Sequence, residues 1–169
     1  MTDTPPHDPR GTPVDAEDIE TGAVTSTRWQ PEVQYAWSAG PAMNRFLAEL
    51  EDGNIVGRKC NACGRVIVPP QMFCSYCYRP TDEWVEVEDT GIVETYSISY
   101  VDPDANPIED PILVGVIDID GASATHGFMH YFEEVDAEEM ERGMPVEAKW
   151  KPESERVGSV LDIEYFRPR

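Results

Sequence analysis

Beyond residue 80, hydrophobic and polar residues alternate in short runs, which is the pattern of half-buried β-strands. Glycine and aspartate separate several of these runs, and the pair Asp120-Gly121 is a turn signal of a β-hairpin. The pattern predicts strands at 83–101, interrupted at 89–91, and then at 111–120, 122–132, 145–151 and 160–166.

A short helix is expected between the third and fourth of these strands, at 136–143. Asp136 is a suitable cap, Glu139 follows three residues later, and Gly143 is a suitable stop. Three strands, a short helix and two strands is the order of a five-stranded oligonucleotide/oligosaccharide-binding barrel, the OB-fold. We therefore expect a mainly β protein that ends in an OB-fold barrel over residues 81–169.

A different period precedes the β region. Within 40–50, apolar residues recur at helical spacing, with Pro41 suited to the first turn and Gly53 to a stop. This pattern predicts one short amphipathic helix, followed by a short strand at 54–60. The apolar stripe either packs in the chain's own core or contacts a partner; it consists of Met43, Phe46, Leu47 and Leu50.

The first 40 residues divide into a tail and an aromatic segment. Residues 1–27 are rich in Pro, Gly and acidic residues and contain few large apolar groups, so we expect a disordered acidic tail. Trp29, Tyr35 and Trp37 then lie within nine residues without a clear period. Such a cluster needs a surface, either on its own domain or on a partner subunit. The aromatic segment and the helix form the unit 28–57.

The charge is strongly negative and unevenly distributed. The net charge is −20, and residues 81–169 alone carry 23 acidic and six basic residues. The only basic region, 41–80, surrounds the cysteines. A protein of this charge repels nucleic acid and anionic membranes, so we disfavour nucleic-acid binding. Only three lysines accompany ten arginines, which is compatible with a salt-rich cytoplasm but does not establish one.

All four cysteines lie in two C-x-x-C pairs within 60–77, on either side of a Pro-Pro corner. Paired cysteines at this spacing are typical of a zinc ribbon, in which four thiolates bind one metal ion. The predicted ligands in the ribbon, 58–80, are Cys60, Cys63, Cys74 and Cys77. Because four protein ligands leave no open position, one structural Zn²⁺ per chain is expected. A rubredoxin-type iron and a dithiol redox pair are the alternatives.

The sequence offers little for catalysis. Every cysteine is assigned to the metal, and no glycine-rich phosphate loop or Ser-His-Asp arrangement is visible. His126 and His130 flank Phe128 on one face of an expected strand. They form either a weak acid/base cluster or part of the barrel wall, and we assign no catalytic residue. No apolar run is long enough to cross a bilayer and no secretion signal is present, so we expect a soluble, cytoplasmic protein.

The chain combines five features in a fixed order: a helix, a C-x-x-C pair, a Pro-Pro pair, a second C-x-x-C pair and an acidic barrel. Ordinary zinc ribbons lack this order. Over roughly residues 28–169, this order resembles the zinc-ribbon plus OB-fold proteins called acyl-CoA-associated. The resemblance implies a non-catalytic accessory subunit of a thiolase-like enzyme that helps bind coenzyme A thioesters. It assigns the four cysteines to zinc, and it makes the helix and ribbon candidates for contacts with a partner or with the coenzyme.

Two further sets of residues are predicted with less support. The basic residues Arg58, Lys59, Arg65 and Arg79 would either contact the phosphates of coenzyme A or surround the charged zinc site. The predicted partner contacts are Trp29, Tyr35, Trp37 and Phe46.

The leading functional expectation is a hetero-oligomeric thiolase complex, an acyltransferase that cleaves a 3-oxoacyl-CoA in a degradative pathway. A partner of a thiolase-derived retro-aldolase is the nearest alternative, and a free-standing acyl-CoA-binding module is another. The sequence does not choose the substrate, because selectivity would lie in the other chain.

Overall fold

The computed structural model describes residues 14–25, 27, 36–104 and 106–169, and the chain divides into two units, 1–37 and 38–169. The described part of the first unit contains one helical turn, α1 (Ala16–Glu20), in a segment where the sequence predicted no helix. The Asp15 side chain accepts a hydrogen bond from the Asp18 amide, and the Asp18 side chain accepts one from the Asp15 amide. This reciprocal cap supplies the local support that a five-residue helix needs.

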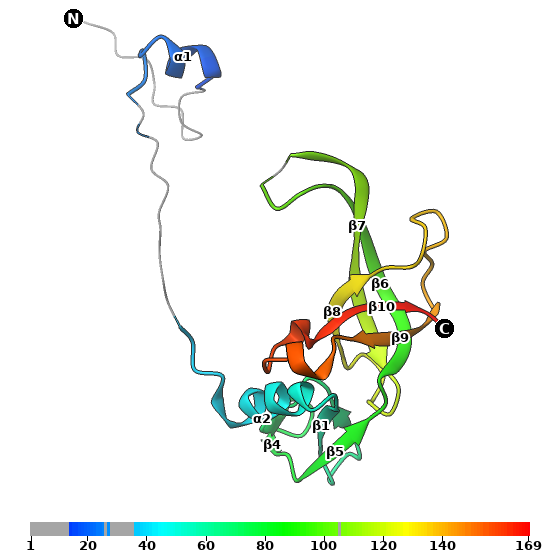
Figure 1. Ribbon diagram of the computed structural model, residues 1–169. Helices are drawn as coiled ribbons and strands as arrows, with labels where there is room; N and C mark the ends of the chain where they lie inside the picture. The colour runs from blue at the N-terminus through cyan, green and yellow to red at the C-terminus, as the bar shows by residue number, and fades with distance from the viewer. Residues whose placement is uncertain (1–13, 26, 28–35, 105) are drawn as a thin grey trace, which may run out of the picture. The chain divides into compact units, whose positions relative to one another are not determined.

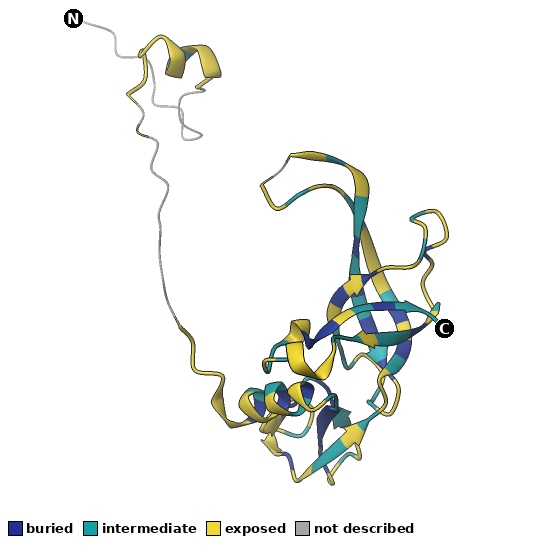
Figure 2. Cartoon of the chain, viewed as in Figure 1, coloured by how far each residue is buried: buried dark blue, intermediate teal, exposed yellow. Residues whose placement is uncertain are grey.

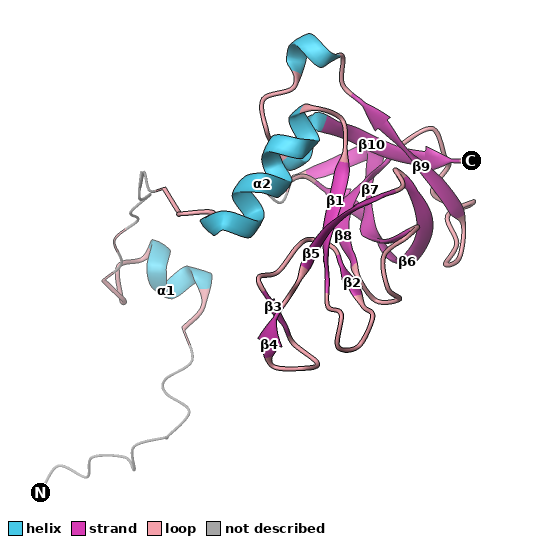
Figure 3. Cartoon of the chain, turned by 90° about the horizontal axis from the view of Figure 1, so that it is seen from below, coloured by secondary structure: helices cyan, strands magenta, loops and turns pink. Residues whose placement is uncertain are grey.

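The second unit begins with α2 (Gly40–Glu51), which confirms the predicted amphipathic helix. Pro41 occupies the first turn, where its missing amide hydrogen costs nothing. Gly53 follows the helix end in the left-handed conformation, with φ of +85°. Figure 3 shows α2 beside β1 (Ile55–Lys59), the strand that leads into the first cysteine pair.

The cysteines lie on a ribbon of short strands. β1 pairs antiparallel with its two neighbours, β2 (Val66–Ile67) and β5 (Glu83–Val87). A second small hairpin joins β3 (Phe73–Cys74) to β4 (Arg79–Pro80). The first part of the predicted strand 83–101 thus extends the ribbon sheet, although the barrel was predicted to begin at residue 81.

Five strands form a closed barrel in the order β10-β8-β7-β6-β9, which confirms the OB-fold prediction (Figure 1). β10 runs antiparallel to β9 and parallel to β8, so it closes the barrel. β6 and β7 are much longer than β8, and they pair from Gly91↔Ile119 to Val101↔Pro107. The barrel strands are β6 (Thr90–Val101), β7 (Pro107–Ile119), β8 (Gly127–Phe132), β9 (Pro145–Trp150) and β10 (Ile163–Pro168).

Two connections differ from the prediction. The expected helix at 136–143 is a turn, in which the Glu139 amide donates to the Asp136 carbonyl and Met140 is buried. The β9–β10 connection instead contains two 3₁₀ turns, η1 (Glu153–Glu155) and η2 (Val160–Asp162). Residues 160–162, predicted to begin the last strand, therefore belong to a turn.

The larger of two hydrophobic clusters runs from α2 through the ribbon sheet into the barrel, where Figure 2 shows buried positions, and the smaller surrounds the cysteines. Phe46 and Leu50 of α2 are fully buried, and the Phe46 ring meets the Phe128 ring of β8 edge to face at 6.1 Å. The core interpretation of the helix stripe is thus correct for these two residues. Among the described residues, no helix is long and apolar enough to span a membrane.

Candidate metal centre

The two cysteine pairs form two similar turns. In the first, the Gly64 amide donates to the Cys60 carbonyl at 2.7 Å; in the second, the Tyr78 amide donates to the Cys74 carbonyl at 2.9 Å. The residue after each second cysteine has positive φ, +75° at Gly64 and 51° at Tyr78. Gly adopts this conformation without strain, whereas Tyr does not. Each turn directs its two sulfur atoms to the same side.

All four sulfur atoms lie within 4.8 Å of one another, as the sequence predicted. The Sγ atoms of Cys63 and Cys74 are 3.8 Å apart. Zinc–sulfur bonds of about 2.3 Å in a tetrahedron place two sulfurs about 3.8 Å apart, whereas a disulfide needs about 2.05 Å. Cys60 and Cys74 are fully buried and Cys63 and Cys77 are half-buried. The four cysteines are therefore arranged to bind a zinc ion.

The electrostatics of the cluster also favour a cation. The backbone amide and the guanidinium of Arg65 lower the pKa of the Cys63 thiol to about 6. Contact with the Cys63 sulfur, together with burial, raises the pKa of Cys77 to about 12. One thiolate thus opposes ionisation of its neighbours, since like charges repel at these distances. A bound dication removes this conflict and lets all four sulfurs ionise.

The predicted coenzyme contacts are arranged around the cluster but differ in exposure. Arg58 is buried, its guanidinium donates to the hydroxyl and carbonyl of Thr81, and it lies 4.9 Å over the Trp84 ring. Arg65 lies 3.8 Å over the Tyr76 ring. Arg79 forms an ion pair with Asp82 at 3.1 Å. The buried, fully engaged Arg58 supports the fold, and phosphate contact by Lys59, Arg65 and Arg79 stays a prediction.

The predicted partner residues have different outcomes. Phe46 is fully buried against Phe128 in its own core, so it presents no surface to a partner. Trp37 is 85% exposed. Trp29 and Tyr35 lie outside the described residues.

The two histidines lie in different surroundings. His130 is buried; its Nε2 donates to the Val160 carbonyl at 3.1 Å, and its Nδ1 accepts from the Tyr131 amide at 2.9 Å. Burial lowers the pKa of His130, which favours its neutral form. The His126 ring instead packs on Tyr76 at 6.0 Å, close to the ribbon, and burial lowers its pKa as well. The barrel-wall interpretation fits His130, whose two ring nitrogens are both engaged with the backbone.

Two features of this unit were not predicted from the sequence. The buried Asp162 accepts hydrogen bonds from three consecutive backbone amides of the β9–β10 connection, and only the fold reveals this role. Met129 and Tyr131 alternate with the inward residues of β8 and are themselves exposed. A strand that is apolar on both faces was the available signal for this second feature.

Two family models match the chain consecutively. Residues 47–83 match the model described as the ChsH2 rubredoxin-like zinc ribbon domain, and residues 84–151 match the ChsH2 C-terminal OB-fold domain. Together they cover the ribbon and most of the barrel.

Two solved structures share the fold. One is a protein of unknown function from the DUF35 family of Sulfolobus solfataricus, with 27% identity and a TM-score of 0.55 over 64% of this chain and 78% of that chain. The other is described as an Ltp2-ChsH2(DUF35) aldolase, with 21% identity and a TM-score of 0.54 over 82% of this chain and 98% of that chain.

Proposed function

Because this chain belongs to the ChsH2 family of proteins, in which a rubredoxin-like zinc ribbon precedes an OB-fold domain, we propose that it is a non-catalytic accessory subunit. Its partner would be a thiolase-like catalytic subunit that makes or breaks a carbon–carbon bond in an acyl-CoA thioester. The zinc ion would be structural and held by Cys60, Cys63, Cys74 and Cys77. A reducing compartment such as the cytoplasm would keep these thiols available for the metal.

The closed cluster of four cysteines is the observation that carries the proposal. Carbon–carbon chemistry on thioesters commonly uses a free thiolate or another activated nucleophile. All four cysteines of the sequence lie in the cluster, where a metal ion would occupy every sulfur. The reacting groups would then come from another chain, and this chain would supply a rigid surface.

The reaction class has two candidates, thiolysis of a 3-oxoacyl-CoA and retro-aldol cleavage. From the sequence alone, thiolysis is the leading expectation. The solved Ltp2-ChsH2(DUF35) structure is described as an aldolase, and this description favours the retro-aldol partner. We therefore place this chain with a thiolase-derived aldolase and keep thiolysis as the second candidate.

The basic residues of the ribbon would serve the coenzyme. Lys59, Arg65 and Arg79 flank the cysteine cluster in an otherwise acidic chain, so they provide the local positive charge that coenzyme A phosphates require. Arg65 and Arg79 already contact Tyr76 and Asp82, so a phosphate would have to share or replace these contacts.

A tagged copy of the chain, captured gently from its native host, tests the proposal. The eluate is examined by mass spectrometry, by zinc assay, and by turnover of 3-oxoacyl-CoA and of aldol-type acyl-CoA substrates. We expect a stoichiometric thiolase-like subunit, one zinc ion per accessory chain, and activity only in the complex.

Three results would contradict parts of the proposal. A zinc-loaded chain that elutes alone and binds acyl-CoA itself would identify a free-standing binding module. Thiolysis without retro-aldol activity would reverse the order of the two reactions. Activity of the isolated chain would refute the non-catalytic role.

A further inference from the structure

The outer surface of the barrel has an unusual composition where OB-folds ordinarily bind their ligands. In this fold, the second and third strands, the loop between strands one and two, and the loop between strands four and five form the ligand face. Here these elements are β7, β8, the β6–β7 connection and the β9–β10 connection. We call this surface the β7–β8 face.

The β7–β8 face is apolar at its centre. Val114 of β7 lies opposite Tyr131 of β8, and Val116 lies opposite Met129. Met129 is 68% exposed and Tyr131 46% exposed, although their neighbours His130 and Phe132 point into the barrel. The β9–β10 connection adds two large exposed residues, Val160 and Leu161. These exposed apolar side chains come from separate elements and form a patch. Such a patch indicates an interaction site, whereas a single exposed apolar residue does not.

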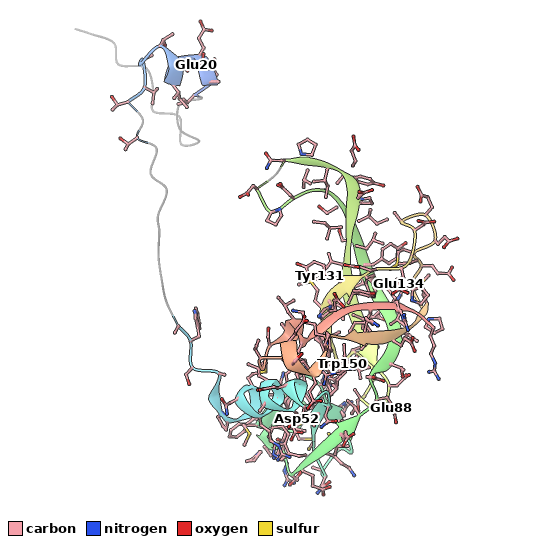
Figure 4. The ribbon with its side chains drawn as sticks, in the orientation of Figure 1. Glu20, Asp52, Glu88, Tyr131, Glu134 and Trp150 are labelled. Atoms are coloured by element: carbon pink, nitrogen blue, oxygen red, sulfur yellow. The ribbon has the colours of Figure 1, made fainter. Side chains whose placement is uncertain are left out.

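Shallow hollows surround the Tyr131 side chain. One, of about 290 Å³, lies toward the β6–β7 connection, and another, of about 130 Å³, lies toward η2; both are lined by Val114, Met129 and Tyr131. A third, of about 440 Å³, is bounded by Tyr131, Ile112 and Glu133. Figure 4 shows Tyr131 on the side of the barrel where the long β6–β7 hairpin rises. The face thus has both projecting side chains and recesses, so a protein partner could bind it with a complementary shape.

The charged residues that line these hollows are of one sign. Asp102 and Glu133 lie among the lining residues of these hollows, which include no Lys or Arg. The sequence has no Lys or Arg between Arg79 and Arg142, a stretch that covers β7 and β8 completely. An OB-fold face that binds nucleic acid needs cations to follow the phosphates. The hollows of this face lack such cations, and their acidic lining would repel coenzyme A phosphates for the same reason.

We propose that the β7–β8 face is the docking surface for the catalytic partner, through a partner segment with apolar side chains framed by Lys or Arg. This inference rests on the proposed function, and it adds the surface and the partner's chemistry. The apolar centre would bury the partner's apolar side chains, and Asp102 and Glu133 would face its cations. Complementary charges of this kind steer association and fix orientation.

A second copy of this chain fits the surface poorly. Two copies of the β7–β8 face would bring together the acidic residues that line its hollows, and like charges at an interface are unfavourable. A membrane surface is also a poor occupant, because anionic lipids would be repelled by Asp102 and Glu133, which we call the acidic frame of the face. A protein of opposite charge is the occupant that satisfies both the apolar centre and the acidic frame.

The first test measures affinity for the catalytic subunit identified by capture from the host. We compare the full-length chain with its Tyr131→Ser and Met129→Ser variants. Both positions point outward on β8, so each variant should retain the barrel, zinc content and unfolding midpoint. We expect each to weaken binding at least about tenfold, as loss of a central apolar contact does. Ile92→Ser is the matched control, because Ile92 is 41% exposed on β6 and lines none of these hollows.

The second test addresses charge. Glu133→Lys should slow association and reduce its dependence on salt, because it places a cation before the partner's cations. Glu138→Lys makes the same charge change at an exposed position outside the hollows, and should have a smaller effect.

The outcomes separate this inference from the proposed function. If the wild-type chain captures no catalytic subunit, both fail. If it captures one and the Tyr131, Met129 and Glu133 variants bind it as tightly as the controls do, only the assigned surface is wrong. Saturable binding of single-stranded DNA that Tyr131→Ser abolishes would also overturn the assignment.

Discussion

The buried side chain of Asp162 determines the local conformation of the β9–β10 connection. Its Oδ1 accepts from the Val157 amide at 3.0 Å, and its Oδ2 accepts from the Gly158 and Ser159 amides, each at 2.8 Å. Three consecutive amides directed at one carboxylate hold the β9–β10 connection in place. This connection also carries Val160 and Leu161 to the β7–β8 face.

Asp162→Ala should therefore destabilise the protein by about 3 kcal/mol, because it removes the acceptor of three partly buried amides at once. Urea unfolding measures the change. The control Glu164→Ala, at an exposed position on β10, should stay within about 0.5 kcal/mol of wild type. An unfolding free energy for Asp162→Ala that equals that of the control would show that the three hydrogen bonds contribute nothing.

His130 makes stability depend on pH. Burial lowers its pKa from the ordinary value of about 6.5, so the unfolded chain takes up a proton at a higher pH than the folded chain. The free energy of unfolding should then fall as the pH drops below about 6.5, and the loss should be complete below the pKa of the folded state.

The test compares urea unfolding of wild type and His130→Gln between pH 7.5 and 5. Gln retains a donor for the Val160 carbonyl but does not titrate, so its stability should decline less across this range. His126 and the carboxylates remain in both proteins and cancel in the comparison. Parallel curves would exclude His130 as the source of the pH dependence.

At the scale of elements, the zinc ribbon depends on a metal ion more than on its strands. β2, β3 and β4 have only two residues each, so their own hydrogen bonds cannot hold the two cysteine turns together. Zinc binding in small modules of this kind contributes on the order of 10 kcal/mol.

Cys77→Ser should accordingly abolish stoichiometric zinc binding and unfold the ribbon. Zinc content by atomic absorption and protease sensitivity of residues 58–80 measure the two effects. Ser75→Ala, in the same turn but not a ligand, serves as the control. Full zinc content in Cys77→Ser would refute the four-cysteine site.

The elements show which parts of the fold the sequence could predict. The alternation from residue 90 onward predicted the barrel strands because it reflects one buried face, and the cysteine spacing predicted the convergent sulfurs. Strand partners were harder to predict: Glu83–Val87 has the same alternation but pairs with β1 of the ribbon, a choice made by tertiary contacts. The helix expected at 136–143 is a turn. The capping and stop residues favour a helix locally, but tertiary contacts that bury Met140 outweigh this local preference.

At the candidate site, too, features set by neighbouring residues could be predicted from the sequence, and features set by tertiary contacts could not. The four ligands follow from spacing alone, because a C-x-x-C turn determines its own geometry. The burial of Arg58 does not, because its partner Thr81 lies 23 residues away. Phe46 was predicted both as a core residue and as a partner contact, and helical periodicity does not distinguish a core from an interface.

For the whole molecule, the dominant property is the net charge of −20. The acidic residues repel one another in the folded state, and salt weakens this repulsion over a Debye length of about 10 Å at 0.1 M. Docking should respond in the opposite direction, because salt also screens the attraction between the acidic frame of the β7–β8 face and a basic partner.

Raising NaCl from 50 to 500 mM should therefore increase the thermal midpoint of the isolated chain by a few degrees and weaken its complex with the catalytic subunit. Differential scanning calorimetry measures the first effect and titration calorimetry the second. The double variant Glu138→Lys/Glu139→Lys distinguishes repulsion within the chain from attraction between the docking surface and the partner. It reduces the net negative charge of the chain but leaves the docking surface unchanged. It should gain stability at low salt and gain less at high salt, while its binding keeps most of the wild-type salt dependence. If its binding instead lost that dependence entirely, attraction would come from the net charge of the chain and not from the β7–β8 face.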